Sequence, residues 1–345
     1  MGTPDTVTKT LMSENKYFAD VFNYFLYGGK QVINPEKLSV KDVTEIALPY
    51  GTNGKITAVQ KHRDVLKSAI IMEDSNAAYL LLGIENQTDI NNAMPVKNML
   101  YDSLQYSYQV RLFGKKHRDE EEKNNSTEST KQKNVDFLSE LHKEDKLVPV
   151  ITLTLYFGAD DWTAPKSLHE MLDVPDKSIL KYVPDYPINL ITPKNIPDGD
   201  FDKFQTEMKQ LLKYIKYSND RNKLDEIVHQ DPAYESISRE VATAIETLTN
   251  TKLNIKKGKK VFNVTNAIDE MKAFAKAEGK AEGRAEGRAE GRAEGRAEGK
   301  AEGRAEGIFE ALIGLVKDGL LPLAVAAQRL NMTVSEFEAK SGLKA

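Results

Sequence analysis

The chain has 345 residues, of which 40% are hydrophobic and 29% are charged, and its formal net charge is −4. These proportions are typical of a globular protein with some solvated segments, and the length suits one large domain with an extension, or two domains. Because the chain contains no cysteine, disulfides, thiolate metal sites and a cysteine nucleophile are excluded, and the five histidines show no pair at metal-ligand spacing that would predict a zinc site. No apolar run approaches the ~20 residues of a membrane helix, and residues 1–14 lack the layout of a signal peptide. We therefore expect a cytoplasmic protein without a membrane partner.

The first predicted elements are a helix, a β-hairpin and a second helix. Residues 13–27 carry a broad aromatic face at helical spacing, and a Gly/Pro-rich break follows them. Residues 64–72 and 78–85 are rich in aliphatic side chains and are separated by a short polar turn, which predicts a hairpin. Residues 91–113 then show helical spacing, with Pro95 in the first turn.

The alternation of strands and helices continues after a charged insertion. Residues 114–134 are polar and charged throughout, which predicts a mobile loop. Residues 147–158 form the strongest predicted strand of the chain. A loop and a short helix are predicted within residues 161–172, and one strand and two helices follow over residues 186–192, 201–217 and 232–249. Interleaved strands and helices predict an α/β domain over residues 1–250.

A low-complexity repeat follows the connecting segment 251–276. Over residues 277–307 the tetrapeptide Ala-Glu-Gly-Lys/Arg recurs with a strict period of four. In a helix this period advances by about 40° per repeat, so no fixed apolar face forms, and like charges fall at i,i+4. Each glycine also costs about 1 kcal/mol relative to alanine in a helix interior. These features favour a flexible or frayed linker over a stable rod.

Residues 308–345 regain an apolar pattern and predict a small helical segment. The pattern indicates a helix to about residue 316, a turn, a second helix, and a third helix whose start carries a capping box between Thr333 and Glu336. A helix–turn–helix arrangement suggests DNA binding, but Glu336 and Glu338 would repel phosphate from the third helix. The tail is therefore expected to mediate self-association or to bind a protein partner.

Glu85 ends an apolar strand, where a carboxylate must pair, cap or bind something. In the predicted hairpin Asp64 begins one strand and Glu85 ends the next, so the two side chains meet at one edge of the sheet. Gln87 shares the face of Glu85 because strand side chains alternate. Two carboxylates beside a backbone carbonyl make a hard oxygen site suited to Mg²⁺, with Mn²⁺ as an alternative. Such an ion activates water and polarises a phosphoryl oxygen.

The pattern of an acid on a first helix followed by D…E-X-K at a hairpin is the signature of the PD-(D/E)XK nuclease superfamily, which this chain resembles. The stretches FADVFN, RDVL, LLGIENQTDINNAMPVKNMLYD and PVITLTLYFGADDWTAPKSL resemble one branch of it, the recombination-promoting nuclease or putative transposase family. The resemblance spans about residues 13–250. It implies a restriction-endonuclease-like core, in which helices flank a central mixed sheet, and metal-dependent DNA cleavage in recombination, mobility or defence.

The resemblance assigns roles to four residues. Asp64 matches the second-motif aspartate and Glu85 the metal-binding glutamate. Gln87 falls where the superfamily usually has lysine, and an amide can position water or a phosphate oxygen but supplies no positive charge. Asp20 matches the acid of the first helix, a role for which Glu14 is a rival.

Two residues of the following helix complete the predicted site. Lys97 falls where the resemblance leads us to expect arginine, and with Tyr101 one turn on it is expected to face substrate phosphate. Because position 87 is glutamine and not lysine, a second function is an alternative. In it, the chain is catalytically degenerate, binds DNA or a protein, and assembles through its tail. A third hypothesis is that the repeat and tail regulate the nuclease through oligomeric state or by masking the cleft.

Overall fold

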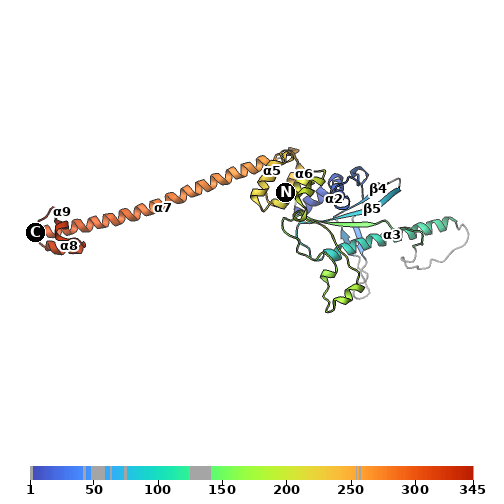
Figure 1. Cartoon of the computed structure of the whole chain (residues 1–345), viewed down its shortest axis with the longest axis horizontal. Helices are drawn as coiled ribbons and strands as arrows, with labels where there is room; N and C mark the ends of the chain where they lie inside the picture. The colour runs from blue at the N-terminus through green and yellow to red at the C-terminus, as the bar shows by residue number, and fades with distance from the viewer. Residues whose placement is uncertain are drawn as a thin grey trace. The chain divides into compact units, whose positions relative to one another are not determined.

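The chain folds into two compact units, Met1–Asp269 and Glu270–Ala345, in a computed structural model (Figure 1). The structure describes residues 3–41, 44–47, 59–62, 64–73, 76–124, 141–253, 255 and 258–344. Within these residues no helix is both long enough and apolar enough to cross a membrane.

The first unit is built on a five-stranded mixed sheet of order β1-β4-β5-β6-β7. Its strands are β1 (Ser39–Val40), β4 (Val65–Glu73), β5 (Asn76–Gln87), β6 (Val150–Tyr156) and β7 (Asn189–Ile191). The strands β1, β4 and β5 pair antiparallel, whereas β5, β6 and β7 are parallel. The predicted hairpin is therefore confirmed as β4–β5. Two further antiparallel pairs lie outside this sheet: β2 (Thr44–Ala47) with β3 (Val59–His62), and β8 (Ile237–Ser238) with β9 (Val261–Phe262).

One face of the sheet carries the apolar core. The helices that contribute to this core are α1 (Pro4–Ser13), α2 (Asn15–Tyr27), α4 (Met208–Tyr217), α5 (Arg221–Gln230) and α6 (Arg239–Thr249). Phe18 and Phe22 of α2 are fully buried in one cluster with Leu82, Ile84 and Leu153 of the sheet. Burying each such side chain contributes roughly 1.5–3 kcal/mol, so this face supplies most of the apolar stabilisation of the unit.

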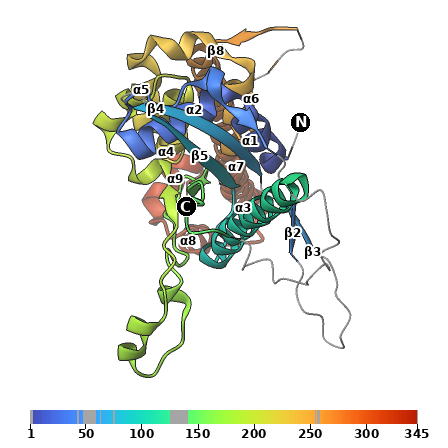
Figure 2. The ribbon, with the colours of Figure 1, turned by 90° about the vertical axis from the view of Figure 1, so that its right-hand side faces the viewer.

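Helix α3 (Met94–Asn124) covers the opposite face, as Figure 2 shows. The side that it turns to the sheet is polar: Asn98 donates to Thr154 Oγ1 over 3.0 Å, and Asp102 accepts a hydrogen bond from Thr152. The helix extends through residues 114–124, where a loop was predicted. Lysine, arginine and glutamate are good helix formers, so an established helix propagates into a charged segment. The rest of the predicted insertion, 125–134, lies outside the described residues.

Short 3₁₀ turns connect many of these elements. They comprise Pro35–Lys37, His169–Met171, Lys177–Tyr182, Pro193–Asn195, Asp198–Lys203 and Pro232–Ser236. The predicted helix 201–217 accordingly begins only at Met208, after one such turn.

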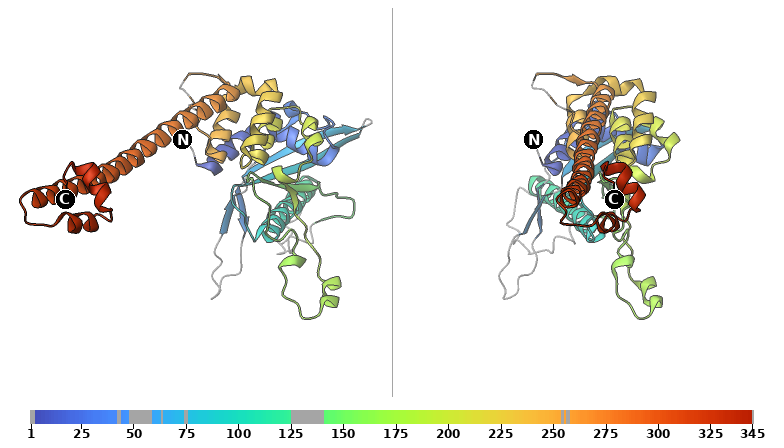
Figure 3. Two further views of the ribbon diagram at one scale, coloured as in Figure 1. Left: turned by 60° about the vertical axis from the view of Figure 1, so that its left-hand side comes forward. Right: turned by 90° about the vertical axis from the view of Figure 1, so that its left-hand side faces the viewer.

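Helix α7 (Val264–Lys317) begins in the first unit and continues through the whole repeat as one helix of 54 residues (Figure 3). This differs from the flexible linker favoured by the sequence. Helix nucleation is the costly step, and both ends of α7 lie in packed clusters, with Val264 in the first and Leu312 in the second. The exposed repeat between them needs only propagation, for which alanine, glutamate, lysine and arginine are well suited.

The end of α7 packs with two short helices, α8 (Leu323–Arg329) and α9 (Val334–Ser341). Phe337 is fully buried and meets the Phe309 ring edge-on at 5.5 Å. The predicted capping box is present, because Thr333 and Glu336 exchange side-chain to backbone hydrogen bonds. The second unit thus has a small apolar core of its own.

Candidate active site

The start of β4, the carboxyl ends of β5 and β6, and the start of α3 meet at one edge of the sheet. Val65 pairs with Ile84 in the antiparallel register, which places Asp64 beside Glu85 on the same face. Glu85 in turn pairs with Thr154 of the parallel strand β6. Ligand sites in open α/β sheets form outside the carboxyl ends of parallel strands, so this edge is where a site is expected.

A polar cavity of about 460 Å³ opens at this edge. Its lining includes Asp64 and Gln87 from the hairpin and Lys97 from α3, together with Asp5 of α1 and Asp89. The cavity therefore gathers carboxylates, amides and one ammonium group. Such a lining suits a polar, charged ligand rather than an apolar one.

Glu85 is fully buried and pairs with Lys97, whose Nζ lies 2.7 Å from Glu85 Oε2. The Lys97 side chain is 31% exposed, so it bridges the buried carboxylate and the cavity. Removing one partner of a buried ion pair costs about 3–5 kcal/mol because the remaining charge is left uncompensated. The ion pair is therefore what allows a buried strand to end on a carboxylate.

Hydrogen bonds to the backbone of β5 fix the other two residues of the hairpin. Asp64 Oδ2 accepts from the backbone N–H of Asn86 over 2.9 Å, which holds this carboxylate against the strand end. Gln87 donates from Nε2 to the Asn86 carbonyl over 2.8 Å, so its own carbonyl oxygen is directed away from that contact. The two side chains thus approach the cavity with oxygen atoms available for a cation.

Asn86 lines the same cavity and has a buried amide, with only 7% of the residue exposed. Neither Oδ1 nor Nδ2 has a hydrogen-bond partner within the part of the chain that the structure describes. More than nine in ten buried polar groups are satisfied in folded proteins, so an orphaned amide in a cavity wall points to a ligand or ion. Because strand side chains alternate, Asn86 points to the other face of β5 from Glu85 and Gln87, so the oxygen-rich set that fits a hard divalent cation such as Mg²⁺ is Asp64, Glu85 and Gln87.

Asp20 is not brought to this cavity. Its carboxylate accepts hydrogen bonds from Gln205 N and Thr206 N, each over 2.9 Å, and from Thr206 Oγ1 over 2.6 Å. Burial raises the pKa of Asp20, although these three donors oppose the increase. These contacts fasten the loop before α4 to α2, so the Asp20 carboxylate lies away from the residues that line the cavity. The rival acid Glu14 is the N-cap residue of α2 and does not line the cavity either.

Tyr101 lies behind Lys97 rather than in the cavity wall. It is 4% exposed, and the Lys97 ammonium lies 5.9 Å from the centre of its ring. This placement puts the Tyr101 ring beside the lysine and outside the cavity lining, and its contact with substrate stays a prediction.

Asp5 is one of two acidic cavity residues, with Asp89, that the sequence prediction missed. Its Oδ1 accepts from the Thr88 hydroxyl over 3.1 Å, which links α1 to the loop after β5. The signal was present in the sequence, because Thr3 as N-cap, Pro4 and an acid in the first turn together mark a helix start.

Residues 133–242 match the model of a family described as putative transposase, YhgA-like. The matched segment contains β6, β7, α4 and α5 and begins after the β4–β5 hairpin, so Asp64, Glu85 and Gln87 lie outside it. No curated protein and no solved structure matches the chain. The match confirms the resemblance predicted from sequence: residues 133–242 of this chain are similar to the YhgA-like putative transposases.

Proposed function

We propose that this chain is a metal-dependent DNA endonuclease whose active site is the cavity beside the β4–β5 hairpin. The observation that carries the proposal is the placement of Asp64 beside Glu85, at a polar cavity that Asp64, Gln87 and Lys97 line. The description of the matched family as transposases supports DNA as the substrate, because transposition requires phosphodiester cleavage. Biological roles in recombination, mobility or defence all use this chemistry.

The proposed cofactor is Mg²⁺, or Mn²⁺ in its place, held by Asp64 and Glu85 with the amide oxygen of Gln87. When bound, such an ion polarises a phosphoryl oxygen and activates a water molecule. Because Lys97 pairs with Glu85, binding of the ion requires that the ammonium turn toward the cavity, where a substrate phosphate would lie. Binding of the ion at Glu85 and the position of the Lys97 ammonium are thus coupled.

Lys97 is the residue that we propose supplies the positive charge missing at position 87. It approaches from α3, while Gln87 approaches from the strand end, and both line the same cavity. In this arrangement Lys97 would stabilise charge on the phosphate in the transition state. Gln87 would position the attacking water or a phosphate oxygen through its amide.

Plasmid nicking by the purified full chain tests the proposal, with Mg²⁺, Mn²⁺ or EDTA present. Asp64→Asn and Glu85→Gln are expected to lower metal-dependent cleavage by at least about 100-fold, because each removes a charge from the ion site. The matched controls are Asp202→Asn and Glu226→Gln, whose carboxylates form exposed ion pairs with Lys209 and Lys223. Cleavage by the two site variants at the wild-type rate would contradict the proposal.

A second candidate function is a non-cleaving DNA- or protein-binding chain. The Glu85–Lys97 ion pair favours it, because a carboxylate already neutralised by an ammonium is a weaker metal ligand. This candidate predicts that DNA is retarded in a gel while no metal supports cleavage. It also predicts that Glu85→Gln changes neither result.

We further propose that the chain assembles into homo-oligomers through its second unit. Several large apolar side chains of that unit are exposed, including Leu320 at 71% and Ile308 at 56%. Exposed apolar groups of this size commonly mark contact surfaces.

A further inference from the structure

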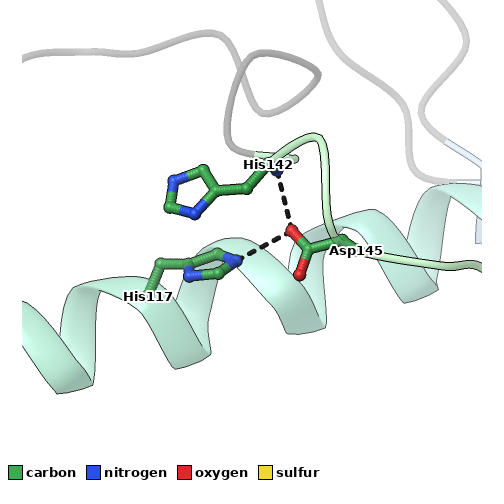
Figure 4. Close-up of side chains that lie close together, drawn as sticks. All are labelled: His117, His142 and Asp145. Carbon is green, nitrogen blue, oxygen red and sulfur yellow. Dashed lines mark hydrogen bonds and ion pairs between the residues drawn. The ribbon is translucent and has the colours of Figure 1, made fainter.

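Two histidines and an aspartate form a compact cluster away from the candidate active site (Figure 4). His117 Nε2 lies 2.9 Å from Asp145 Oδ2, and the same oxygen accepts the backbone N–H of His142 over 2.7 Å. The rings of His117 and His142 are tilted by 33° to each other, with their centres 3.7 Å apart. One ligand atom from each of the three residues lies within 4.8 Å of the others.

The cluster joins two separate parts of the chain. His117 lies on α3, whereas His142 and Asp145 belong to the segment that leads into β6. This segment is already fastened to α3 nearer the sheet, where the Gln109 side chain exchanges hydrogen bonds of 2.7 and 3.0 Å with the Val148 backbone. His117 is two helical turns beyond Gln109, so the cluster extends the same contact between α3 and the segment that leads into β6.

The donor set suits a borderline divalent transition metal. Imidazole nitrogens and a carboxylate oxygen are ligands of Zn²⁺ at about 2.0–2.2 Å, which places neighbouring ligand atoms about 3.3 Å apart in a tetrahedron. The observed 2.9 Å between His117 and Asp145 needs to open by only a few tenths of an ångström. The side chains of His117 and Asp145 are 17% and 11% exposed, so most of their surface is shielded from solvent. His142 is exposed, so an ion can reach the site from solvent.

We propose that His117, His142 and Asp145 bind one Zn²⁺ ion, with water as the fourth ligand. The ion would pin the segment entering β6 to the outer part of α3. This site is independent of the proposed nuclease function and shares no residue with the Asp64–Glu85 cavity. Sequence spacing could not reveal it, because the two histidines come from distant positions that only the α3–β6 packing brings together.

Zn²⁺ titration of the full chain by calorimetry, with Mg²⁺ in excess to occupy oxygen-only sites, tests the proposal. His117→Ala, His142→Ala and Asp145→Asn are each expected to weaken one Zn²⁺ site at least 100-fold. His169→Ala is the matched control, since this histidine also lies near a carboxylate, at 3.9 Å from Asp185, but in no three-ligand cluster among the described residues. His229→Ala removes the more exposed group of Asp225, His229 and Asp269 and should leave the proposed site intact.

Wild-type affinity and stoichiometry in His142→Ala would overturn the proposal, as would an equal loss in His169→Ala. Amide hydrogen exchange gives a second measurement that does not depend on a variant folding correctly. Zn²⁺ should slow exchange in residues 141–149 and in the last turns of α3 of the wild-type chain. Unchanged exchange there at saturating Zn²⁺ would also overturn it.

Discussion

In the proposed active site, Lys97 and Gln87 would divide between two elements the role that one strand lysine has in the PD-(D/E)XK pattern. The Lys97 ammonium lies on α3, 2.7 Å from Glu85 Oε2, and the Gln87 amide lies at the end of β5. If the charge and not its position matters, Lys97→Gln should lower cleavage by roughly 10²–10³-fold, the usual cost of losing one transition-state donor. Adding Gln87→Lys to that variant should recover part of the lost rate in the plasmid assay.

Two controls separate this effect from a folding defect. Lys97→Arg keeps the charge beside Glu85 and should retain most activity, whereas Lys223→Gln removes an exposed lysine of α5 and should change nothing. Circular dichroism should show that Lys97→Gln is folded, because the variant leaves a buried carboxylate without its cation. If the Lys97→Gln chain is folded and cleaves at the wild-type rate, Lys97 does not supply the positive charge that is missing at position 87.

Lys67 is a buried lysine on the opposite face of β4, at the junction of α1 and α2. Its Nζ donates to the Ser13 carbonyl and to Asn15 Oδ1, each over 2.7 Å. Burial lowers the pKa of Lys67 from 10.5 to about 8, and the nearby Glu14 carboxylate opposes this shift. The charged form is thus disfavoured in the folded state.

The depressed pKa of Lys67 should therefore make the folded protein more stable against unfolding as the pH rises. Between about pH 8 and 10.5 the unfolded chain keeps the proton of Lys67 while the folded chain has released it. The unfolded state then binds more protons, so the free energy of unfolding rises with pH over this window. Urea unfolding should show that, between pH 7.5 and 10, the free energy of unfolding of wild type rises relative to that of Lys67→Met. A difference in unfolding free energy between the two proteins that does not vary with pH would contradict this.

Local geometry explains which site residues the sequence could predict. Asp64, Glu85 and Gln87 belong to one hairpin, so strand alternation and register alone bring them together. Asp20 was assigned by resemblance, and its real partners, Gln205 and Thr206, come from a distant loop that no local pattern shows.

At the level of elements, periodic segments could be predicted and context-dependent ones could not. The hairpin, β6 and the capping box have strong local signals. Helix α5, whose mean composition is polar, was missed because only Leu224, Ile227 and Val228 mark its buried face. The repeat was predicted as a linker because local propensity counts its glycines but not the packed clusters at both ends of α7.

The glycines of the repeat should make the middle of α7 its weakest part. A Cβ at Gly287, Gly291 or Gly295 would meet nothing within 4 Å, so alanine fits without strain. Each Gly→Ala change should stabilise the helix by about 0.5–1 kcal/mol, because glycine loses more conformational entropy on folding. The triple variant should show slower amide exchange across residues 281–303 than wild type.

Gly28→Ala is the matched control for the repeat. Gly28 ends α2 with φ of 61°, and it also has open space around its Cβ position. The same substitution there should destabilise the first unit by roughly 1 kcal/mol, because left-handed backbone disfavours a side chain. Equal exchange rates in the wild-type and triple-variant repeat would show that glycine does not limit the stability of α7.

At the scale of the whole molecule, the two units have separate cores and different surfaces. The first unit buries most of its large apolar side chains in one large cluster, whereas the described core cluster of the second unit comprises five buried residues, and both units leave some large apolar side chains exposed. Leu315, at 41%, and Leu320, at 71%, flank the turn between α7 and α8. A core this small gains stability most readily by covering such groups with another chain.

We therefore expect the full chain to be an oligomer and a chain ending at residue 276 to be a monomer, as measured by light scattering after size-exclusion chromatography. Leu320→Glu with Leu315→Glu should dissociate the full chain without shortening it, because charges placed in an apolar contact must be desolvated. The matched control, Lys317→Glu, introduces a carboxylate in place of an ammonium at the last residue of α7 and should leave the mass unchanged. If the full chain is already monomeric, the tail does not mediate assembly. If truncation lowers the mass and also changes plasmid nicking, the repeat and tail regulate the site through oligomeric state.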